Sequence, residues 1–324
     1  MIRRSSAFVV DLLMCASMNF VQARHRLHAR SRAEMEAYVN DCEKLTAQDF
    51  YAVPGNISIP QALNGQYGAT ITWPSPVRSA FPGNDIARVD LYPCARGWEA
   101  PTVLMLHALM STSDDGYRRW AARFNEMGWN ACFMHLPYHY SRVPQGYWNG
   151  ELAITADLMR NAEGLRQGVI EVRQVMAALR AQGGREFGLL GTSYGGWIGA
   201  LLAAVESEFR FVALMAPIVN VHHALWESPA AITMRRELRK AGIDQALILR
   251  HFHLSSPSHM QPLVRPDRIL LVAGDYDLVA RPADIMALHQ KWQGSELLQV
   301  PQGHFGYRMM RETVAWLQAR WLHN

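Results

Sequence analysis

The sequence predicts an α/β fold with a mostly parallel central sheet flanked by helices. Largely apolar runs typical of strands buried on both faces recur along the chain, at residues 102–106, 187–190, 211–215 and 269–273. Between these runs, residues 117–127 and 158–179 carry apolar side chains at helical spacing. Helices of that length between buried strands act as crossover connections, so the strands that they join are expected to be parallel.

Segments outside this alternating core form the start and the end of the predicted structure. Residues 69–73 and 88–92 are expected to be early strands, and the Pro- and Gly-containing loop between them suits an antiparallel pair. Residues 1–60 are expected to form an N-terminal helical extension, and residues 61–324 the main domain. The final helix carries one apolar stripe for packing on the sheet, made of Met310, Val314, Leu317 and Trp321.

A candidate nucleophile stands between a predicted strand and a predicted helix. Residues 191–196 read Gly-Thr-Ser-Tyr-Gly-Gly, after the apolar run at 187–190 and before a run of small apolar residues. A serine at a tight strand-to-helix turn is held in a strained conformation, and Gly191 and Gly195 would let strand and helix approach closely. We therefore predict that the turn exposes Ser193 as a nucleophile.

A serine hydroxyl needs a base and an orienting acid, and both follow in loops after predicted strands. Asp275 and Asp277 come after the run at 269–273, and His304 comes after the run at 297–300. We predict that Asp277 is the acid and His304 the base. Asp275 competes for the acidic role. The alternatives are a turn carboxylate that caps the next helix for Asp277, and a loop histidine bonded to backbone for His304.

With Ser193, Asp277 and His304 in this order, the chain resembles the α/β-hydrolase superfamily from its first buried strand onward. In that superfamily the acid commonly stands three residues after a strand-ending glycine, which matches Gly274 and Asp277. A Gly-His pair follows the last strand, as Gly303 and His304 do here. The resemblance implies an α/β-hydrolase fold that carries a Ser-His-Asp triad.

A narrower resemblance concerns the residues after the strand that ends near Met134. The stretch Leu136-Pro137-Tyr138-His139, continuing through Arg142, Pro144 and Gly150-Glu151, is similar to poorly characterised bacterial α/β-hydrolases related to the abhydrolase-domain-containing 18 group. That group brings no known substrate.

The superfamily resemblance also implies two backbone amides that would stabilise an oxyanion. One is the amide of Tyr194, the residue after the nucleophile. The other belongs to the loop after the first central strand, where Leu109 is the matching residue. Superfamily members usually have glycine at the position of Ala108, and alanine restricts the backbone there.

A helical cap is predicted at about residues 219–265, because the segment between the strands at 211–215 and 269–273 is too long for a simple crossover. In the α/β-hydrolase fold, an insertion at this place sits over the strand ends and would close the pocket. Trp226 in the cap is a predicted substrate contact. Five histidines in the cap give no recognised zinc spacing, so we expect no metal. The apolar area of the cap could equally face a partner.

The remaining predicted substrate contacts lie in two loops that follow strands. They are His107, after the first central strand, and Tyr138 and Arg142, in an aromatic loop. Arg142 would meet a carboxylate or phosphate of the substrate. The alternative is an ordered loop that is packed by its own aromatic side chains.

Composition excludes several classes of protein. The chain has 324 residues, 49% hydrophobic and 19% charged, which suffices for a sizeable core. The net charge of +4 is small, and basic residues alternate with acidic ones in the helices, so no nucleic-acid partner is expected. Four cysteines without C-x-x-C spacing predict neither a zinc site nor a dense disulfide framework.

The N-terminal segment superficially resembles a secretory signal, because Arg3 and Arg4 precede an apolar run. Asp11 interrupts that run, and no clear small-x-small cleavage site follows. We therefore expect a cytoplasmic protein, with export as the alternative. No stretch is expected to be long and apolar enough to span a bilayer.

These observations together predict a serine hydrolase that cleaves a small-molecule carboxylic ester or thioester through an acyl-enzyme, with no metal or organic cofactor. The same triad would also serve amide hydrolysis, lactone opening or acyl transfer. A non-catalytic binding protein that has kept the fold is the alternative from another class. The sequence leaves the oligomeric state open.

Overall fold

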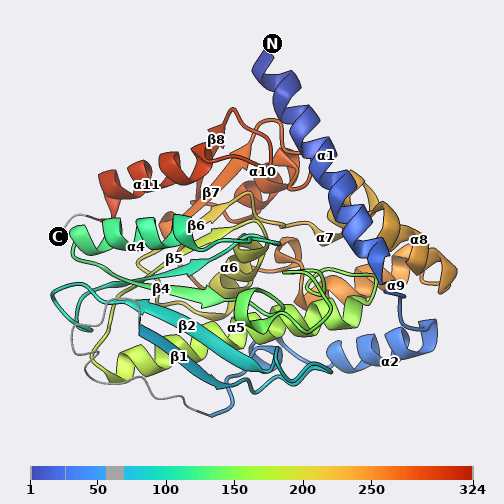
Figure 1. Ribbon diagram of the computed structural model, residues 1–324, viewed down its shortest axis with the longest axis horizontal. Helices are drawn as coiled ribbons and strands as arrows, with labels where there is room; N and C mark the ends of the chain where they lie inside the picture. Colours follow the sequence, from blue (N-terminus) through green and yellow to red (C-terminus); the bar gives the residue numbers. More distant parts are fainter. Residues whose placement is uncertain (1, 26, 56–68, 323–324) are drawn as a thin grey trace.

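Eight strands form one sheet in the computed structural model, which describes residues 2–25, 27–55 and 69–322 (Figure 1). The strands are β1 (Ala69–Pro74), β2 (Ile86–Tyr92), β3 (Thr102–Leu106), β4 (Asn130–His135), β5 (Phe187–Thr192), β6 (Phe211–Met215), β7 (Ile269–Gly274) and β8 (Glu296–Val300). Their order across the sheet is β1-β2-β4-β3-β5-β6-β7-β8. β2 pairs antiparallel with β1 and β4, and the other neighbouring pairs are parallel. The predicted sheet, parallel apart from its start, is confirmed.

The apolar runs of the sequence form the buried centre of this sheet. Every residue of β3, β4, β6 and β7 is buried, because each of these strands has a neighbour on both sides and helices over its faces. β8 lies at the edge and is mostly only half-buried. The parallel strands all have their carboxyl ends on the same side of the sheet. The loops after β3, β5, β7 and β8 therefore meet on that side.

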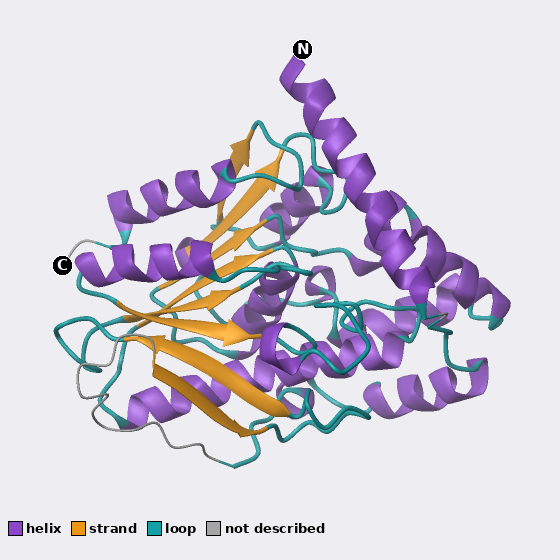
Figure 2. Cartoon of the chain, viewed as in Figure 1, coloured by secondary structure: helices purple, strands orange, loops and turns teal. Residues whose placement is uncertain are grey.

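Helices cover both faces of the sheet (Figure 2). The described helices are α1 (Ile2–Arg24), α2 (Arg32–Cys42), α3 (Ala47–Phe50), α4 (Asp115–Glu126), α5 (Leu158–Ala181), α6 (Tyr194–Val205), α7 (Val221–Trp226), α8 (Ile232–Lys240), α9 (Gln245–His251), α10 (Pro282–Lys291) and α11 (Arg308–Arg320). α4 and α11 lie on one face of the sheet, and α5, α6 and α10 on the other (Figure 1). Most of α6 is buried, as its small apolar residues predict.

The N-terminal helix α1 packs along α8 and the short turn at Pro229–Ala231 (Figure 1). Asn19 holds it there. The amide of the Asn19 side chain donates to the carbonyl of Pro229 at 2.7 Å, and its oxygen accepts from the backbone N–H of Thr233 at 2.8 Å. The residues described before position 56 are thus largely helical, and the division into an extension and a main domain stays a prediction.

By length and composition, α1 could also cross a membrane. Its segment Arg4–Arg24 has a mean hydropathy of 1.4 over its most apolar window, which is 22% buried. Our expectation that no stretch reaches this length and apolarity is therefore wrong. One such helix near the N-terminus is only a weak indication of a span, since signal sequences and core helices meet the same criterion.

The predicted cap region, about residues 219–265, contains the three short helices α7, α8 and α9. Val221, Leu225 and Met234 from this region line the main cavity of the described structure. The segment between β6 and β7 therefore forms part of the cavity wall, and its role as a cap stays a prediction.

A buried ion pair fixes the loop after β4 to α5. The guanidinium of Arg142 makes two hydrogen bonds to the carboxylate of Glu171, at 2.6 and 2.9 Å, and neither side chain is more than 1% exposed. Arg142 also donates to the carbonyls of Asn84 and His135, both at 3.0 Å. Because several acceptors surround the guanidinium, their hydrogen bonds offset the desolvation free energy of burying its charge.

Glu171→Gln is expected to lower the free energy of unfolding by about 3 kcal/mol, because it leaves the charge of Arg142 buried without a counter-ion. Urea denaturation would measure the loss. The control is Glu36→Gln, which breaks the exposed pair of Arg32 and Glu36 and should cost no more than about 0.5 kcal/mol. Equal losses in the two variants would contradict a structural role for the buried pair.

Candidate active site

Ser193 stands at the turn from β5 into α6, in a strained backbone conformation. Its φ is 53° and its ψ is −110°, a combination that residues with side chains rarely adopt. A Cβ atom at Gly195 would lie 2.3 Å from the carbonyl oxygen of Leu106, and one at Gly191 would lie 2.5 Å from the carbonyl oxygen of Gly195. Both positions therefore require glycine, which is why the glycine spacing located this turn.

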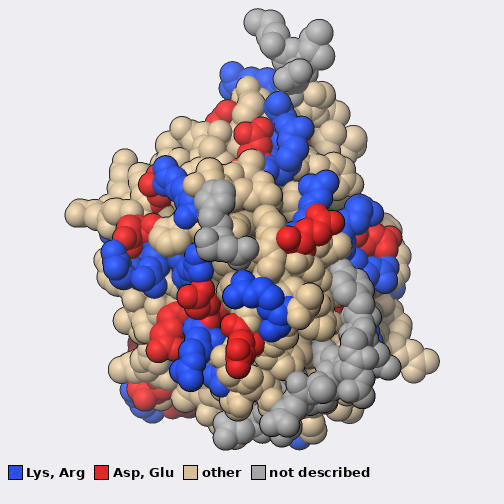
Figure 3. Space-filling view, turned by 90° about the vertical axis from the view of Figure 1, so that its left-hand side faces the viewer, with Lys and Arg blue, Asp and Glu red and all other residues tan. Residues whose placement is uncertain are grey.

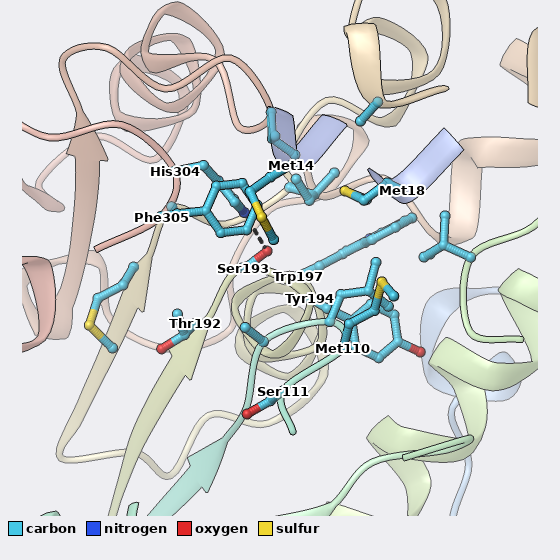
Figure 4. A pocket seen from close by; sticks show the side chains of 18 of the residues that line it. Met14, Met18, Met110, Ser111, Thr192, Ser193, Tyr194, Trp197, His304 and Phe305 are labelled. Atoms are coloured by element: carbon cyan, nitrogen blue, oxygen red, sulfur yellow. Dashed lines mark hydrogen bonds between the residues drawn. The ribbon is translucent and has the colours of Figure 1, made fainter. Parts of the chain in front are cut away.

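Three side chains from separate loops form one hydrogen-bonded chain. Ser193 Oγ lies 2.8 Å from His304 Nε2 (Figure 4), and His304 Nδ1 lies 2.8 Å from Asp277 Oδ2. The other oxygen of Asp277 accepts from the backbone N–H groups of Val279 and Ala280, both at 2.8 Å. The two amides and the imidazole together fix the orientation of the carboxylate.

Asp275, the competing carboxylate, does not join this chain. Its side chain is exposed, whereas Asp277 is 4% exposed and faces His304. The geometry therefore favours Asp277 as the partner of the histidine.

The surroundings of His304 stabilise its protonated form. Burial opposes a charge on the ring, but the nearby carboxylate of Asp277, by its charge and its hydrogen bond, and the charge of Asp11 raise the pKa of His304 above the usual 6.5. A histidine in this environment is suited to hold a proton taken from Ser193.

Two backbone amides without an acceptor in the described structure belong to residues that line the same cavity as Ser193. Among the described residues, the amides of Tyr194 and Leu109 have no hydrogen-bond acceptor, and both residues line the cavity. The positive φ in the loop after β3 falls at Met110, at 57°, rather than at Ala108. Alanine therefore fits the position where superfamily members usually have glycine.

His139 holds this loop in place. Its Nε2 accepts from the backbone N–H of Met110 at 3.1 Å, and its Nδ1 donates to the carbonyl of Pro137 at 2.8 Å. Burial lowers the pKa of His139 to about 4, so the ring stays neutral and keeps its acceptor nitrogen. Sequence reasoning quoted this residue only as part of a resemblance and missed its role.

The four predicted substrate contacts are corrected by the structure, because none of them lines the cavity. His107 is fully buried and accepts from the backbone N–H of Leu136, and Arg142 is fully buried against Glu171. Tyr138 is 2% exposed and packs edge-on against Phe81. Trp226 faces Arg239, while its neighbours Ala224 and Leu225 line the cavity.

A large, mostly apolar cavity of about 1050 Å³ opens beside Ser193 (Figure 4). Methionines form much of its wall, namely Met14, Met18, Met110, Met215, Met234, Met309 and Met310. Met14 and Met18 come from α1, which the sequence reasoning did not connect with the site. Four arginines also contribute to the lining, namely Arg119, Arg123, Arg308 and Arg311.

The described residues contain no group of three or more His, Cys, Asp or Glu side chains arranged to hold a metal ion. His251, one of the cap histidines, is buried among the helices, and burial lowers its pKa to about 3.

Comparison with known proteins gives few relatives by sequence. No family model matches the chain. Two curated proteins match, the uncharacterized protein MT2702 of Mycobacterium tuberculosis strain CDC 1551 / Oshkosh and the uncharacterized protein Rv2627c of strain H37Rv. Each is 26% identical over 205 residues, which cover 63% of this chain and 48% of the relative. The match thus spans about half the length of these relatives.

Comparison of structures is more informative. Acetyl xylan esterase 1 from Thermoanaerobacterium sp. JW/SL YS485 aligns with a TM-score of 0.59 at 13% identity, over 90% of this chain and 94% of that one. An acetyl xylan esterase from Paenibacillus sp. R4 aligns with a TM-score of 0.56 at 13% identity, over 94% and 98%. A putative hydrolase from Agrobacterium vitis S4 gives 0.54 at 16% identity, over 78% and 97%. The chain has the α/β-hydrolase fold, as predicted.

The pKa of His304 is expected to lie above 6.5 and to fall below 6.5 in Asp277→Asn, because burial then outweighs the remaining charge of Asp11. A histidine NMR titration, with His304→Gln to assign the signal, would measure both values. Asp275→Asn is the matched control and should leave the titration unchanged, since Asp275 is exposed and its side chain has no contact with His304. An unchanged pKa in Asp277→Asn would contradict the interpretation.

Proposed function

We propose that this chain is a serine hydrolase that cleaves a carboxylic ester or thioester through an acyl-enzyme. The observation that carries the proposal is the chain of 2.8 Å hydrogen bonds from Ser193 through His304 to Asp277, at the edge of the sheet where the strands end. The solved structures with the same fold include acetyl xylan esterases, which is consistent with ester chemistry. The family resemblance in the sequence supports the same roles.

The proposed reaction begins with proton transfer. His304 Nε2 takes the proton of Ser193 Oγ as the oxygen attacks the carbonyl carbon of the ester, and Asp277 stabilises the imidazolium that forms. His304 then gives this proton to the leaving alkoxide or thiolate, which departs and leaves the acyl group on Ser193. Water, activated by His304, attacks the acyl-enzyme, and the acid product leaves as the serine regains its proton.

The oxyanion of each tetrahedral intermediate would accept hydrogen bonds from the amides of Tyr194 and Leu109. Neither amide is used elsewhere among the described residues, so both are available without rearrangement. Donors that are already in place need no reorganisation as the oxyanion forms, so they stabilise it without an added free-energy cost. The neutral ring of His139 supports this arrangement, because it fixes Met110, the residue after Leu109.

The cavity favours a small-molecule ester with an apolar acyl or alcohol group. Its volume of about 1050 Å³ lies just above the range of roughly 300–1,000 Å³ for small-molecule pockets, so it has room for more than an acetyl group. The face in Figure 3 intermingles basic and acidic groups, which does not suit nucleic acid. Chemistry on amides or lactones, or acyl transfer, would use the same residues.

Two further proposals rest on the sequence. The loop that runs from Leu136 through Arg142 to Glu151 supports a relationship to the abhydrolase-domain-containing 18 group. A cytoplasmic location is supported by the four free cysteines, all buried, and by Asp11 within the apolar run of α1.

Ser193→Ala is expected to abolish labelling by a fluorophosphonate probe and to lower ester turnover by several orders of magnitude, because the nucleophile is lost. Gel fluorescence and p-nitrophenyl ester hydrolysis would measure these effects. Ser111→Ala is the matched control, since Ser111 also lines the cavity but lies outside the hydrogen-bonded chain, and it should keep its labelling. Probe-silent wild-type protein that still binds a ligand tightly would favour a non-catalytic binding protein.

A panel of p-nitrophenyl esters, thioesters, lactones and amides is expected to show the highest kcat/KM for esters or thioesters with acyl groups longer than acetyl, because the apolar wall gains contact with each added methylene. Steady-state kinetics on the wild-type protein would measure the order. A preference for acetyl esters over all longer chains would contradict this interpretation of the cavity.

A further inference from the structure

We propose that α1 is a working part of the active site, and that its Asp11 is a positioning residue which holds the loops of Asp277 and His304 together. The inference deepens the proposed function, because positioning matters only if these two residues act on Ser193. It concerns a residue that lies 266 positions before Asp277 in the chain, in the N-terminal helix α1.

The carboxylate of Asp11 binds both loops at once. It accepts from the backbone N–H of His304 at 2.8 Å through Oδ2 and at 3.0 Å through Oδ1. It also accepts from the backbone N–H of Phe305 at 3.4 Å and from that of Leu278 at 3.1 Å. Leu278 directly follows Asp277, so one side chain fixes the backbone of the proposed acid and of the proposed base.

The surroundings of Asp11 fit a carboxylate and leave little room for another group. Asp11 is fully buried, and the donors that bind its side chain in the described structure are backbone amides. Several converging N–H groups stabilise a carboxylate, whereas an amide side chain would turn N–H groups toward some of them. A Cβ atom at Gly303 would lie 2.6 Å from Oδ1 of Asp11, so glycine before His304 makes room for this contact.

Beyond Asp11, α1 is held to the rest of the protein at two further points. Asn19, two turns further on, bonds to Pro229 and Thr233 in the cap region. Arg24, in the last turn, lies over the ring of Trp148 at 3.9 Å and donates to the carbonyl of Gly146 at 3.2 Å. Between Asp11 and Asn19, Met14 and Met18 face the cavity beside Ser193 (Figure 4).

Asp11→Asn is the decisive variant. It is expected to lower kcat for a p-nitrophenyl ester by about 10- to 100-fold with little change in KM. Small displacements of reacting groups lower the rate of the chemical step by about that factor. Removing the charge should also move the acidic limb of kcat/KM to lower pH, since the negative charge of Asp11 favours protonated His304. The other titratable group that acts on His304 is Asp277. The Cys15 thiol interacts with Asp11 and Asp277 and stays neutral, because burial raises its pKa to about 11.

The matched control is Asn19→Ala, which loosens the same helix without touching either loop. It should lower Tm but leave kcat and the acidic limb of the profile as in the wild type. Wild-type kcat and pH profile in Asp11→Asn would overturn the inference. So would an equal kcat loss and pH shift in Asn19→Ala. A wild-type protein that no fluorophosphonate labels would instead refute the proposed function itself.

Gly303→Ala gives a second test that keeps every charge. The added methyl group would displace the carboxylate of Asp11, so the labelling rate should fall about as much as in Asp11→Asn while the chain stays folded by circular dichroism. In the double variant, the loss should not exceed the larger single loss, because both changes remove the same contact. If the two losses in labelling rate multiplied in the double variant, the inference would be overturned. A wild-type labelling rate in Gly303→Ala would also overturn it.

Discussion

The close approach of the turn after β5 to the end of β3 is the constraint on which the site depends. The backbone N–H of Gly195 donates to the carbonyl of His107 at 3.0 Å, and a side chain at position 195 would collide with β3. This contact sets the distance between Ser193 and the loop of Leu109. The amide of Ser193 also donates to the carbonyl of Met215 at 2.8 Å, which ties the same turn to β6. The strained serine is thus held from two neighbouring strands.

Three buried histidines around this turn show how surroundings divide one residue type into two roles. Within the described residues, His107 and His139 have no carboxylate partner. Burial lowers the pKa of both, so each stays neutral and accepts a backbone N–H. The side chain of His304 is 7% exposed, but Asp277 and Asp11 raise its pKa. The neutral rings fix loops, and the third is suited to carry a proton.

The sequence was sufficient to predict those parts of the molecule whose structure local patterns determine. Apolar runs located the buried strands, because a parallel strand is covered on both faces, and glycine spacing located Ser193, because the strained turn excludes side chains. Asp277 and His304 followed from their places after strands. Their mutual contact is a geometric result that the order of residues alone could only suggest.

The predictions that failed concern contacts between distant segments. Arg142 has the chemistry to bind an anionic substrate, but its partner is Glu171, and nothing local reveals that pairing. Periodicity did not show that Leu225 rather than Trp226 would face the cavity. Asp11 was noticed only as a break in an apolar run. Its bonds to Leu278 and His304 join the two ends of the chain, beyond the reach of any pattern in a short window.

The methionine wall of the cavity has a chemical consequence of its own. Thioether side chains are unbranched and polarizable, so such a wall can adapt to acyl groups of different shape without a large penalty. The same sulfur atoms are open to oxidants that enter with solvent. Peroxide would convert them to sulfoxides, which are polar and bulkier, and an oxidised wall would accept hydrocarbon poorly until a reductase restored it.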